Sequence, residues 1–325
     1  MSAPTISLVL GSGGARGYAH IGAIEELRAQ GYDIRSIAGA SMGALVGGVY
    51  AAGKLDVYRD WVKALQRMDV VRLLDWTFRG GLIKGDRIVG KLKDMIGEVN
   101  IEDLPISYTA VAVDLMAQRE VWFSRGALFD AIRASIAIPT VLRPHRYQGR
   151  LLVDGGLLNP VPITPTLRDL TDCTIAIDVN AQAEPLNGDG EPAPDMLLDD
   201  HADTEALPAA PDGATPMLAD GSSSADATQL PGYRQRIAEF IDSFKREKKV
   251  AQTEPGILEL FARSLDVVQE TVTRFKLAAQ PPDLVVRIPR NACAFYEFHR
   301  AEEVIELGRV RTREALRLFR LPTKS

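Results

Sequence analysis

The sequence predicts an α/β fold, in which helices cover both faces of a mainly parallel sheet. Three observations lead to this prediction. Residues 5–53 alternate two apolar, strand-like runs with two helix-like segments, an order that is typical of parallel sheets. Further β-branched runs return after residue 107. The 325 residues, 46% of them hydrophobic, are sufficient for one large core.

The N-terminal third contains the clearest elements. Residues 5–11, TISLVLG, are apolar and β-branched and predict a buried strand. The segment 17–31 has apolar residues at helical spacing and ends at Gly31, a suitable helix C-cap. The same criteria predict a strand at 36–40, a helix of small residues at 42–53, and amphipathic helices over 55–98 interrupted by RGGLIKGD.

The rest of the chain continues this pattern around one unlike segment. Strands are predicted at 107–115, 119–124, 150–156, 173–180 and 283–289, and helices at 129–137, 233–249, 255–279 and 294–316. Residues from about 184 to 232 are rich in Pro, Ala, Asp, Gly and Ser and predict a disordered acidic insertion. We therefore expect a single domain over 1–325, with this insertion at 184–232 and a helical C-terminal part at 233–325.

The distribution of charge and the two cysteines bear on the compartment and the partners that we expect for this protein. The net charge is −5, yet residues 184–230 hold eleven acidic residues and no Lys or Arg, so the remainder is positive. That bias suits an enzyme acting on anionic lipid, and equally an ordinary surface. Cys173 and Cys293 have no disulfide or metal-ligand spacing and are expected as free thiols. With no signal peptide or spanning run, we expect a cytoplasmic protein that can reach the inner membrane face.

The glycine-rich loop GSGGARG, residues 11–17, is suited to a negative group. A dinucleotide fingerprint requires G-x-G-x-x-G, and Arg16 occupies its third glycine position. The Lys-Ser/Thr pair of a P-loop is absent as well, so a nucleotide is disfavoured. Backbone N–H groups of such a loop can instead hold an oxyanion. We expect these donors among Gly13, Gly14, Ala15 and Arg16.

Residues 39–43, GASMG, match the G-x-S-x-G nucleophile elbow between a predicted strand and a predicted helix. The turn imposes strained backbone angles on Ser41, so small neighbours are required. The N-terminus of the following helix favours the negative charge that develops near Ser41. Ser41 is therefore the candidate nucleophile of an acyl transfer.

The base for Ser41 stays open at this level. Of the four histidines, His20 lies in the first helix, where packing or hydrogen bonding is expected, and His201 lies in the acidic insertion. The other two are His145 and His299. A carboxylate could serve as well, because three aspartates follow apolar strands: Asp114, Asp154 and Asp178. Their positions at strand ends do not separate them.

Four blocks, taken in order, resemble those of the patatin-like phospholipases and esterases, in particular bacterial members and the catalytic domain of neuropathy target esterase. They are GSGGARG (11–17), GASMG (39–43), ASIAIP (134–139) and DGG (154–156) continuing into NPVP. RGGLIKGDRI (79–88) and FHRAEEVIELG (298–308) are similar to the bacterial branch. The resemblance covers 5–182 and, more weakly, 283–308, and implies a patatin-like three-layer αβα fold.

The resemblance also implies a Ser–Asp dyad without a catalytic histidine. Ser41 would be the nucleophile and Asp154 the general base, with no cofactor or metal. The substrates would be fatty-acyl esters of phospholipids or lysophospholipids, cleaved through an acyl-enzyme. Met42 would reshape the acyl pocket. The supporting glycines would be Gly11, Gly17, Gly39, Gly43, Gly155 and Gly156.

Two alternatives remain beside this hypothesis. One is an α/β-hydrolase esterase whose Ser-Asp-His triad uses His299. The other is a non-catalytic module that responds to lipid or nucleotide, which the presence of both Ser41 and Asp154 disfavours. The expected partner is the lipid substrate, with transient membrane contact and no nucleic acid; homo-oligomerisation is left open. Residues 61–88 mix aromatic and cationic side chains, which suits a lipid-facing surface or a helical cap.

Overall fold

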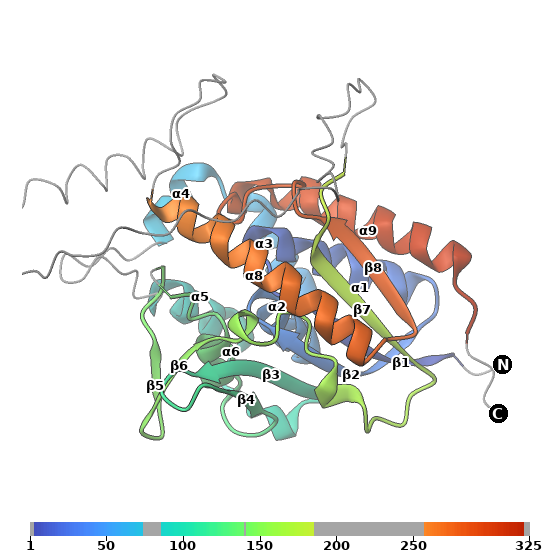
Figure 1. Ribbon diagram of the computed structural model, residues 1–325, viewed down its shortest axis with the longest axis horizontal. Helices are drawn as coiled ribbons and strands as arrows, with labels where there is room; N and C mark the ends of the chain where they lie inside the picture. The colour runs from blue at the N-terminus through green and yellow to red at the C-terminus, as the bar shows by residue number, and fades with distance from the viewer. Residues whose placement is uncertain (1–2, 74–85, 140, 185–256, 322–325) are drawn as a thin grey trace, which may run out of the picture. The chain divides into compact units, whose positions relative to one another are not determined.

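The computed structural model describes residues 3–73, 86–139, 141–184 and 257–321. Figure 1 shows one central sheet flanked by helices. The strands are β1 (Thr5–Leu10), β2 (Asp33–Ala40), β3 (Ser107–Asp114), β4 (Arg119–Phe123), β5 (His145–Tyr147), β6 (Arg150–Asp154), β7 (Cys173–Ala181) and β8 (Leu284–Pro289). The α-helices are α1 (Ala19–Ala29), α2 (Met42–Ala51), α3 (Leu55–Ala64), α4 (Arg67–Leu73), α5 (Asp86–Ile96), α6 (Leu128–Ser135), α8 (Ile257–Ala279) and α9 (Ala301–Leu318). Short 3₁₀ turns lie at Gly14–Tyr18, Ile101–Asp103, Gly155–Leu157, Thr164–Thr166 and Phe298–Arg300.

The sheet confirms the predicted α/β fold and its parallel centre. Its strand order is β5-β6-β3-β2-β1-β7-β8, with β4 paired to β3. Strands β3, β2, β1, β7 and β8 run parallel, and β4, β5 and β6 add an antiparallel edge. Because parallel strands end at the same edge, the segments that follow β1 and β2 meet there. Open α/β sheets bind ligands at this carboxyl edge.

Alternate residues of β1 enter two different layers of the core. Leu8 and Leu10 belong to the large cluster that contains the apolar residues of α1, α2 and α9. Val9 points to the other face and packs in a smaller cluster, against which Leu277 of α8 lies. Helices thus cover both faces, as a three-layer αβα fold requires.

Helices α1 and α9 pack side by side, and two glycines permit the close approach (Figure 1). A Cβ on Gly22 would lie 1.9 Å from the carbonyl oxygen of Ile305. A Cβ on Gly308 would lie 2.1 Å from the carbonyl oxygen of Ala19. The late FHRAEEVIELG block therefore ends in a glycine that holds the last helix against the first.

The structure differs from the predicted elements at a few places. The last helix begins at Ala301 rather than at residue 294. The preceding segment turns instead, because the Glu297 carboxylate accepts the Ala294 N–H at 2.8 Å and the Phe295 carbonyl accepts the Ala15 N–H at 2.8 Å. The short strand β5 was not predicted. Almost all of the acidic insertion, together with the helix predicted at 233–249, lies outside the described residues.

The structure also bears on the predictions for residues 61–88, for the two cysteines and for membrane-spanning helices. Within 61–88, Val70 is buried and Trp61 packs on Tyr58, as in a helical cap, while residues 74–85 lie outside the described part. Cys173 and Cys293 are buried free thiols. Among the described helices, none combines the length and apolarity needed to cross a bilayer.

Candidate active site

Ser41 stands in a strained turn between β2 and α2. Its φ of 55° and ψ of −123° lie where a residue other than glycine is rarely found. The flanking glycines make this turn possible. A Cβ on Gly43 would lie 2.0 Å from the Leu10 carbonyl oxygen, and one on Gly39 would lie 2.5 Å from the Gly43 carbonyl carbon. The elbow predicted from GASMG is therefore present, with the Ser41 side chain at the carboxyl edge of the sheet.

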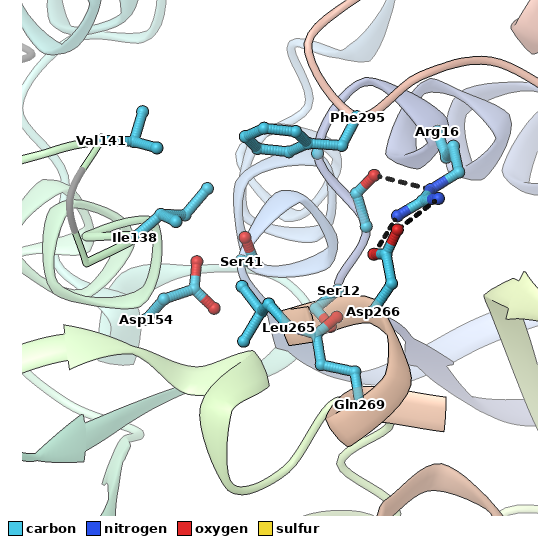
Figure 2. Close-up of a pocket in the computed structure, with 12 residues that line it drawn as sticks. Ser12, Arg16, Ser41, Ile138, Val141, Asp154, Leu265, Asp266, Gln269 and Phe295 are labelled. Carbon is cyan, nitrogen blue, oxygen red and sulfur yellow. Dashed lines mark hydrogen bonds and ion pairs between the residues drawn. The ribbon is translucent and has the colours of Figure 1, made fainter. Parts of the chain in front are cut away.

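Asp154 reaches the same place from β6. The pairing of Asp154 with Ala112 of β3 sets its position along the sheet, and β3 lies beside β2. Gly155 allows this approach, because its Cβ would lie 2.0 Å from the Val111 carbonyl oxygen. Figure 2 shows the carboxylate of Asp154 pointing toward Ser41. The two side chains are 4% and 3% exposed.

The environment of Asp154 favours its neutral form. Burial raises the pKa of this carboxyl to about 7, while the Ser41 hydroxyl and the Gly156 N–H act in the opposite direction. Oδ1 accepts the Gly156 N–H at 2.7 Å. Oδ2 is buried and completes no hydrogen bond of normal geometry within the described part of the chain. One carboxylate oxygen is thus held, and the other is available.

The other two strand-end aspartates serve their own turns. Oδ1 of Asp114 accepts the backbone N–H groups of Met116 and Ala117 at 3.2 and 3.1 Å. Oδ1 of Asp178 accepts the Asn180 N–H at 3.0 Å. Neither aspartate lines the cavity that contains Ser41. Tertiary structure therefore separates three residues that their positions in sequence did not.

The described histidines lie away from Ser41. His20 is fully buried in α1 and its Nε2 lies 2.8 Å from the Gly11 carbonyl oxygen, which confirms the predicted packing role. His145 on β5 lies 3.4 Å from an Asp130 oxygen. His299 accepts a hydrogen bond from Arg67 at 3.1 Å. None of these three rings lines the Ser41 cavity.

The glycine loop supplies fewer donors than the sequence predicted. The Ala15 N–H donates to the Phe295 carbonyl at 2.8 Å, and the Arg16 N–H donates to the Gly13 carbonyl at 3.2 Å. These two groups are therefore occupied, which corrects the expectation for both residues. The N–H groups of Gly13 and Gly14 donate no hydrogen bond within the described residues. Gly14 has a φ of 55°, and its Cβ would lie 2.4 Å from the Phe295 carbonyl oxygen.

The Arg16 side chain fixes the glycine-rich loop in place through bonds to other parts of the protein. The guanidinium is buried and pairs with Asp266 of α8 at 2.7 Å. It also donates to the carbonyls of Gly13 at 3.3 Å and Arg290 at 3.1 Å. Such a forked set of bonds fixes the loop against two distant segments.

The remaining motif positions have packing roles. A Cβ on Gly17 would lie 2.4 Å from the Met42 Cβ, and one on Gly11 would lie 3.0 Å from the Ile177 carbonyl oxygen. Met42 belongs to the main core and does not line the Ser41 cavity. Gly156 lies against Ser12, because its Cβ would meet the Ser12 Oγ at 2.6 Å.

The ASIAIP block forms hydrogen bonds with the backbone of both candidate residues. The Ser41 N–H donates to the Ser135 hydroxyl at 2.9 Å, and that hydroxyl donates to the Val111 carbonyl at 2.6 Å. The Asp154 N–H donates to the Ala137 carbonyl at 3.0 Å. One short segment thus orients the strained elbow and the end of β6 together.

Replacing Ser135 with alanine is expected to lower kcat about tenfold while KM stays near its original value. The Ser41 N–H would lose its acceptor, which costs about 1–3 kcal/mol when the group stays buried, and the elbow would lose its fixed orientation. Steady-state turnover of a short-chain ester measures the effect. Ser7→Ala is the matched control: Ser7 is also buried and hydrogen-bonded, but lies at the opposite end of β1. Equal turnover of the two variants, at equal folded fraction, would contradict a positioning role.

The candidate residues line one small cavity of about 30 Å³ (Figure 2). Six side chains of its wall were not singled out from the sequence: Ile138, Val141, Leu265, Asp266, Gln269 and Phe295. The ASIAIP block contains Ile138, so that position was signalled. The positions on α8 and Phe295 lie in none of the motif blocks, so the sequence did not indicate that they line the cavity. No group of three or more His, Cys, Asp or Glu in the described residues is placed to hold a metal.

Comparisons with known proteins show what this chain is similar to. The family model described as patatin-like phospholipase matches residues 8–167. An uncharacterized NTE family protein of Mycobacterium tuberculosis is 42% identical over 340 residues, covering 98% of this chain and 93% of that protein. Neuropathy target esterase of Drosophila melanogaster is 32% identical over 186 residues, covering 55% of this chain and 13% of that protein. The solved structure of VipD from Legionella pneumophila aligns with a TM-score of 0.35 at 16% identity, covering 55% of this chain and 50% of that chain.

Proposed function

Because the chain belongs to the patatin-like phospholipase family, whose members are lipid ester hydrolases, we propose that it cleaves fatty-acyl esters of phospholipids or lysophospholipids with Ser41 and Asp154 as a catalytic dyad. One observation carries the proposal. A buried carboxylate with one unoccupied oxygen points toward a serine in a strained elbow, in a cavity where no described histidine takes part. A serine hydroxyl needs such a base, and direct contact with it, to attack an ester.

The reaction begins with proton transfer from Ser41 to Asp154. As the proton moves to Oδ2, Ser41 Oγ attacks the ester carbonyl and a tetrahedral oxyanion forms. The N–H groups of Gly13 and Gly14 donate to this oxyanion, and each such donor contributes about 3 kcal/mol of transition-state stabilisation. Protonated Asp154 then gives its proton to the departing alcohol or lysolipid, leaving an acyl-enzyme.

Water completes the cycle by the same route. Asp154 takes a proton from the water while the water oxygen attacks the acyl carbonyl. Collapse of the second tetrahedral intermediate returns the proton to Ser41 Oγ and releases the fatty acid.

The raised pKa of Asp154 is what makes a carboxylate adequate for this task. A carboxyl of ordinary pKa is too weak a base for a serine hydroxyl, and catalysis works best when the base has a pKa near the working pH. Burial moves Asp154 to about 7. Ala137 and Gly156 keep it in place through backbone hydrogen bonds. The same desolvation that penalises the charged form therefore strengthens the base.

The test of this function is product analysis on mixed lipids. Purified protein is incubated with vesicles containing phosphatidylcholine, phosphatidylglycerol and a lysophospholipid, and products are identified by mass spectrometry. We expect free fatty acid together with the matching lysolipid or glycerophosphodiester, and none above background with Ser41→Ala. Intact lipids after prolonged incubation, or equal release by both proteins, would contradict the proposal.

A further inference from the structure

Helix α8 turns polar side chains toward the protein. Gln269 and Thr273 are buried, and the Gln269 side-chain oxygen accepts hydrogen bonds from the Ser12 hydroxyl at 3.2 Å and from the Asn180 side chain at 3.1 Å. Asp266 pairs with Arg16 at 2.7 Å, and Lys276 pairs with Glu120 at 2.9 Å. Polar contacts thus hold the helix to the body of the protein, together with Leu277, which packs on the smaller apolar cluster.

The opposite side of the same helix is apolar and exposed. Val267 and Phe275 are 61% and 73% exposed, and Leu260 and Val268 are exposed as well. Their spacing of seven and eight residues places Leu260, Val267 and Phe275 on one face. A helix on a soluble protein normally buries its apolar side and exposes its polar side. Here several apolar side chains lie on the exposed side, and exposed apolar surface of this kind marks an interaction site.

The charged residues with described side chains on this side of α8 are arginines. Arg263 and Arg274 are exposed and lie at helical spacing from the apolar residues, so they share their face. The two acidic residues of α8 with described side chains, Asp266 and Glu270, are paired with arginines of the body. We call the set Leu260, Arg263, Val267, Val268, Arg274 and Phe275 the outer face of α8. Apolar residues bordered by arginines fit the boundary between acyl chains and anionic headgroups.

The position of α8 connects this face with the candidate active site. Leu265, Asp266 and Gln269 form part of the wall of the Ser41 cavity (Figure 2). That cavity, at about 30 Å³, accommodates a water or two, whereas pockets for small-molecule ligands measure about 300–1,000 Å³. An acyl chain needs more room than this cavity provides, and α8 is the part of its wall whose far side exposes apolar side chains.

We propose that the outer face of α8 is the surface by which the protein docks on an anionic lipid bilayer, which rests on the proposed lipid hydrolysis and specifies how that substrate is met. Docking places the helix that covers Ser41 in contact with the acyl chains. A second copy of the chain fits this face less well, because a two-fold contact along one helix brings Arg263 and Arg274 of both copies near each other.

The test measures vesicle binding apart from catalysis. All proteins carry Ser41→Ala, so the lipid is not consumed, and are sedimented with vesicles of phosphatidylcholine and phosphatidylglycerol in equal parts. Adding V267E and F275E together is expected to weaken binding about tenfold or more, because two apolar side chains no longer enter the bilayer. Arg274→Gln is expected to weaken binding to these vesicles and to leave binding to pure phosphatidylcholine unchanged.

The matched control adds L167E and L170E, which place two equal charges on exposed leucines. Both leucines precede β7, at the edge of the sheet opposite to Ser41. This control should bind vesicles as the parent does. Equal binding by the V267E/F275E protein, or no binding by the parent, would overturn the proposal, as would a dimer that the V267E/F275E change converts to a monomer.

The two proposals fail in different ways. With Ser41 intact, the V267E/F275E protein should hydrolyse a soluble short-chain ester at the original rate and vesicle lipid more slowly. Vesicle binding without lipid hydrolysis would refute the proposed function and retain the docking face. Lipid hydrolysis that is unaffected by V267E and F275E would refute the docking face and retain the function.

Discussion

Ser41→Ala is expected to lower ester turnover by about 10³-fold or more and to abolish labelling by a fluorophosphonate. Loss of a serine nucleophile removes the covalent route entirely, leaving only oxyanion binding and substrate positioning. The fold should persist, because alanine fits the volume of serine and the turn depends on Gly39 and Gly43. Turnover of a p-nitrophenyl ester and in-gel detection of the label measure the two effects, and circular dichroism verifies folding.

The cavity contains a second serine that serves as the control. Ser12 lines the same cavity, but its hydroxyl is engaged with Gln269 at 3.2 Å. The Ser12→Ala protein should therefore still be labelled at Ser41. A label that survives Ser41→Ala and disappears in Ser12→Ala would assign the nucleophile to the glycine loop instead.

Asp154→Asn is expected to reduce turnover by about 10²–10⁴-fold, the usual contribution of a general base. Asparagine retains the size of the side chain and its contact with the Gly156 N–H, but cannot accept the Ser41 proton. His299→Gln should change turnover by a few-fold at most, because His299 lies against Arg67 rather than in the cavity. If His299→Gln abolishes turnover while Asp154→Asn leaves it near normal, a triad replaces the dyad.

The dependence of kcat/KM on pH is a second test of the role of Asp154. The base must be ionised, and burial raises the pKa of Asp154 to about 7, so kcat/KM should rise with pH and level off above that value. The stability of the folded protein should change with pH in the opposite direction, falling as the pH rises. Between the ordinary aspartate pKa of 3.8 and about 7, the folded state binds this proton more tightly than the unfolded state. The stability contributed by protonated Asp154 is therefore present at low pH and is lost as the pH rises through about 7.

It follows that Asp154→Asn should unfold at a higher temperature than the parent above pH 7, where the parent must bury a charge. Near pH 4 the two proteins should differ little. A profile of kcat/KM that is flat between pH 5 and 8, or an Asp154→Asn protein that is less stable at pH 8, would contradict this account of the site.

The local chemistry of the chain was sufficient to predict most elements of the described fold. The alternation of apolar strands with small-residue helices produced the parallel centre, because each segment can bury its apolar side only in such layers. Boundaries failed where a distant contact competes with local propensity. The segment before Ala301 is the clearest case: the Ala15 N–H occupies the Phe295 carbonyl, and that turn delays the start of α9.

For the candidate site, the sequence by itself determined Ser41, because a nucleophile elbow is a local structure whose glycines and serine lie within five residues. Position at a strand end did not distinguish Asp154 from Asp114 and Asp178; the resemblance implied Asp154, and the pairing of β6 with β3 is what brings that residue to Ser41. Tertiary structure decided that Gly13 and Gly14, rather than Ala15 and Arg16, retain unused N–H groups. The wall formed by α8 depends on a contact across some 250 residues, Arg16 to Asp266. Motifs record local geometry, whereas burial, hydrogen-bond occupancy and the enclosure of a cavity arise only when distant segments meet.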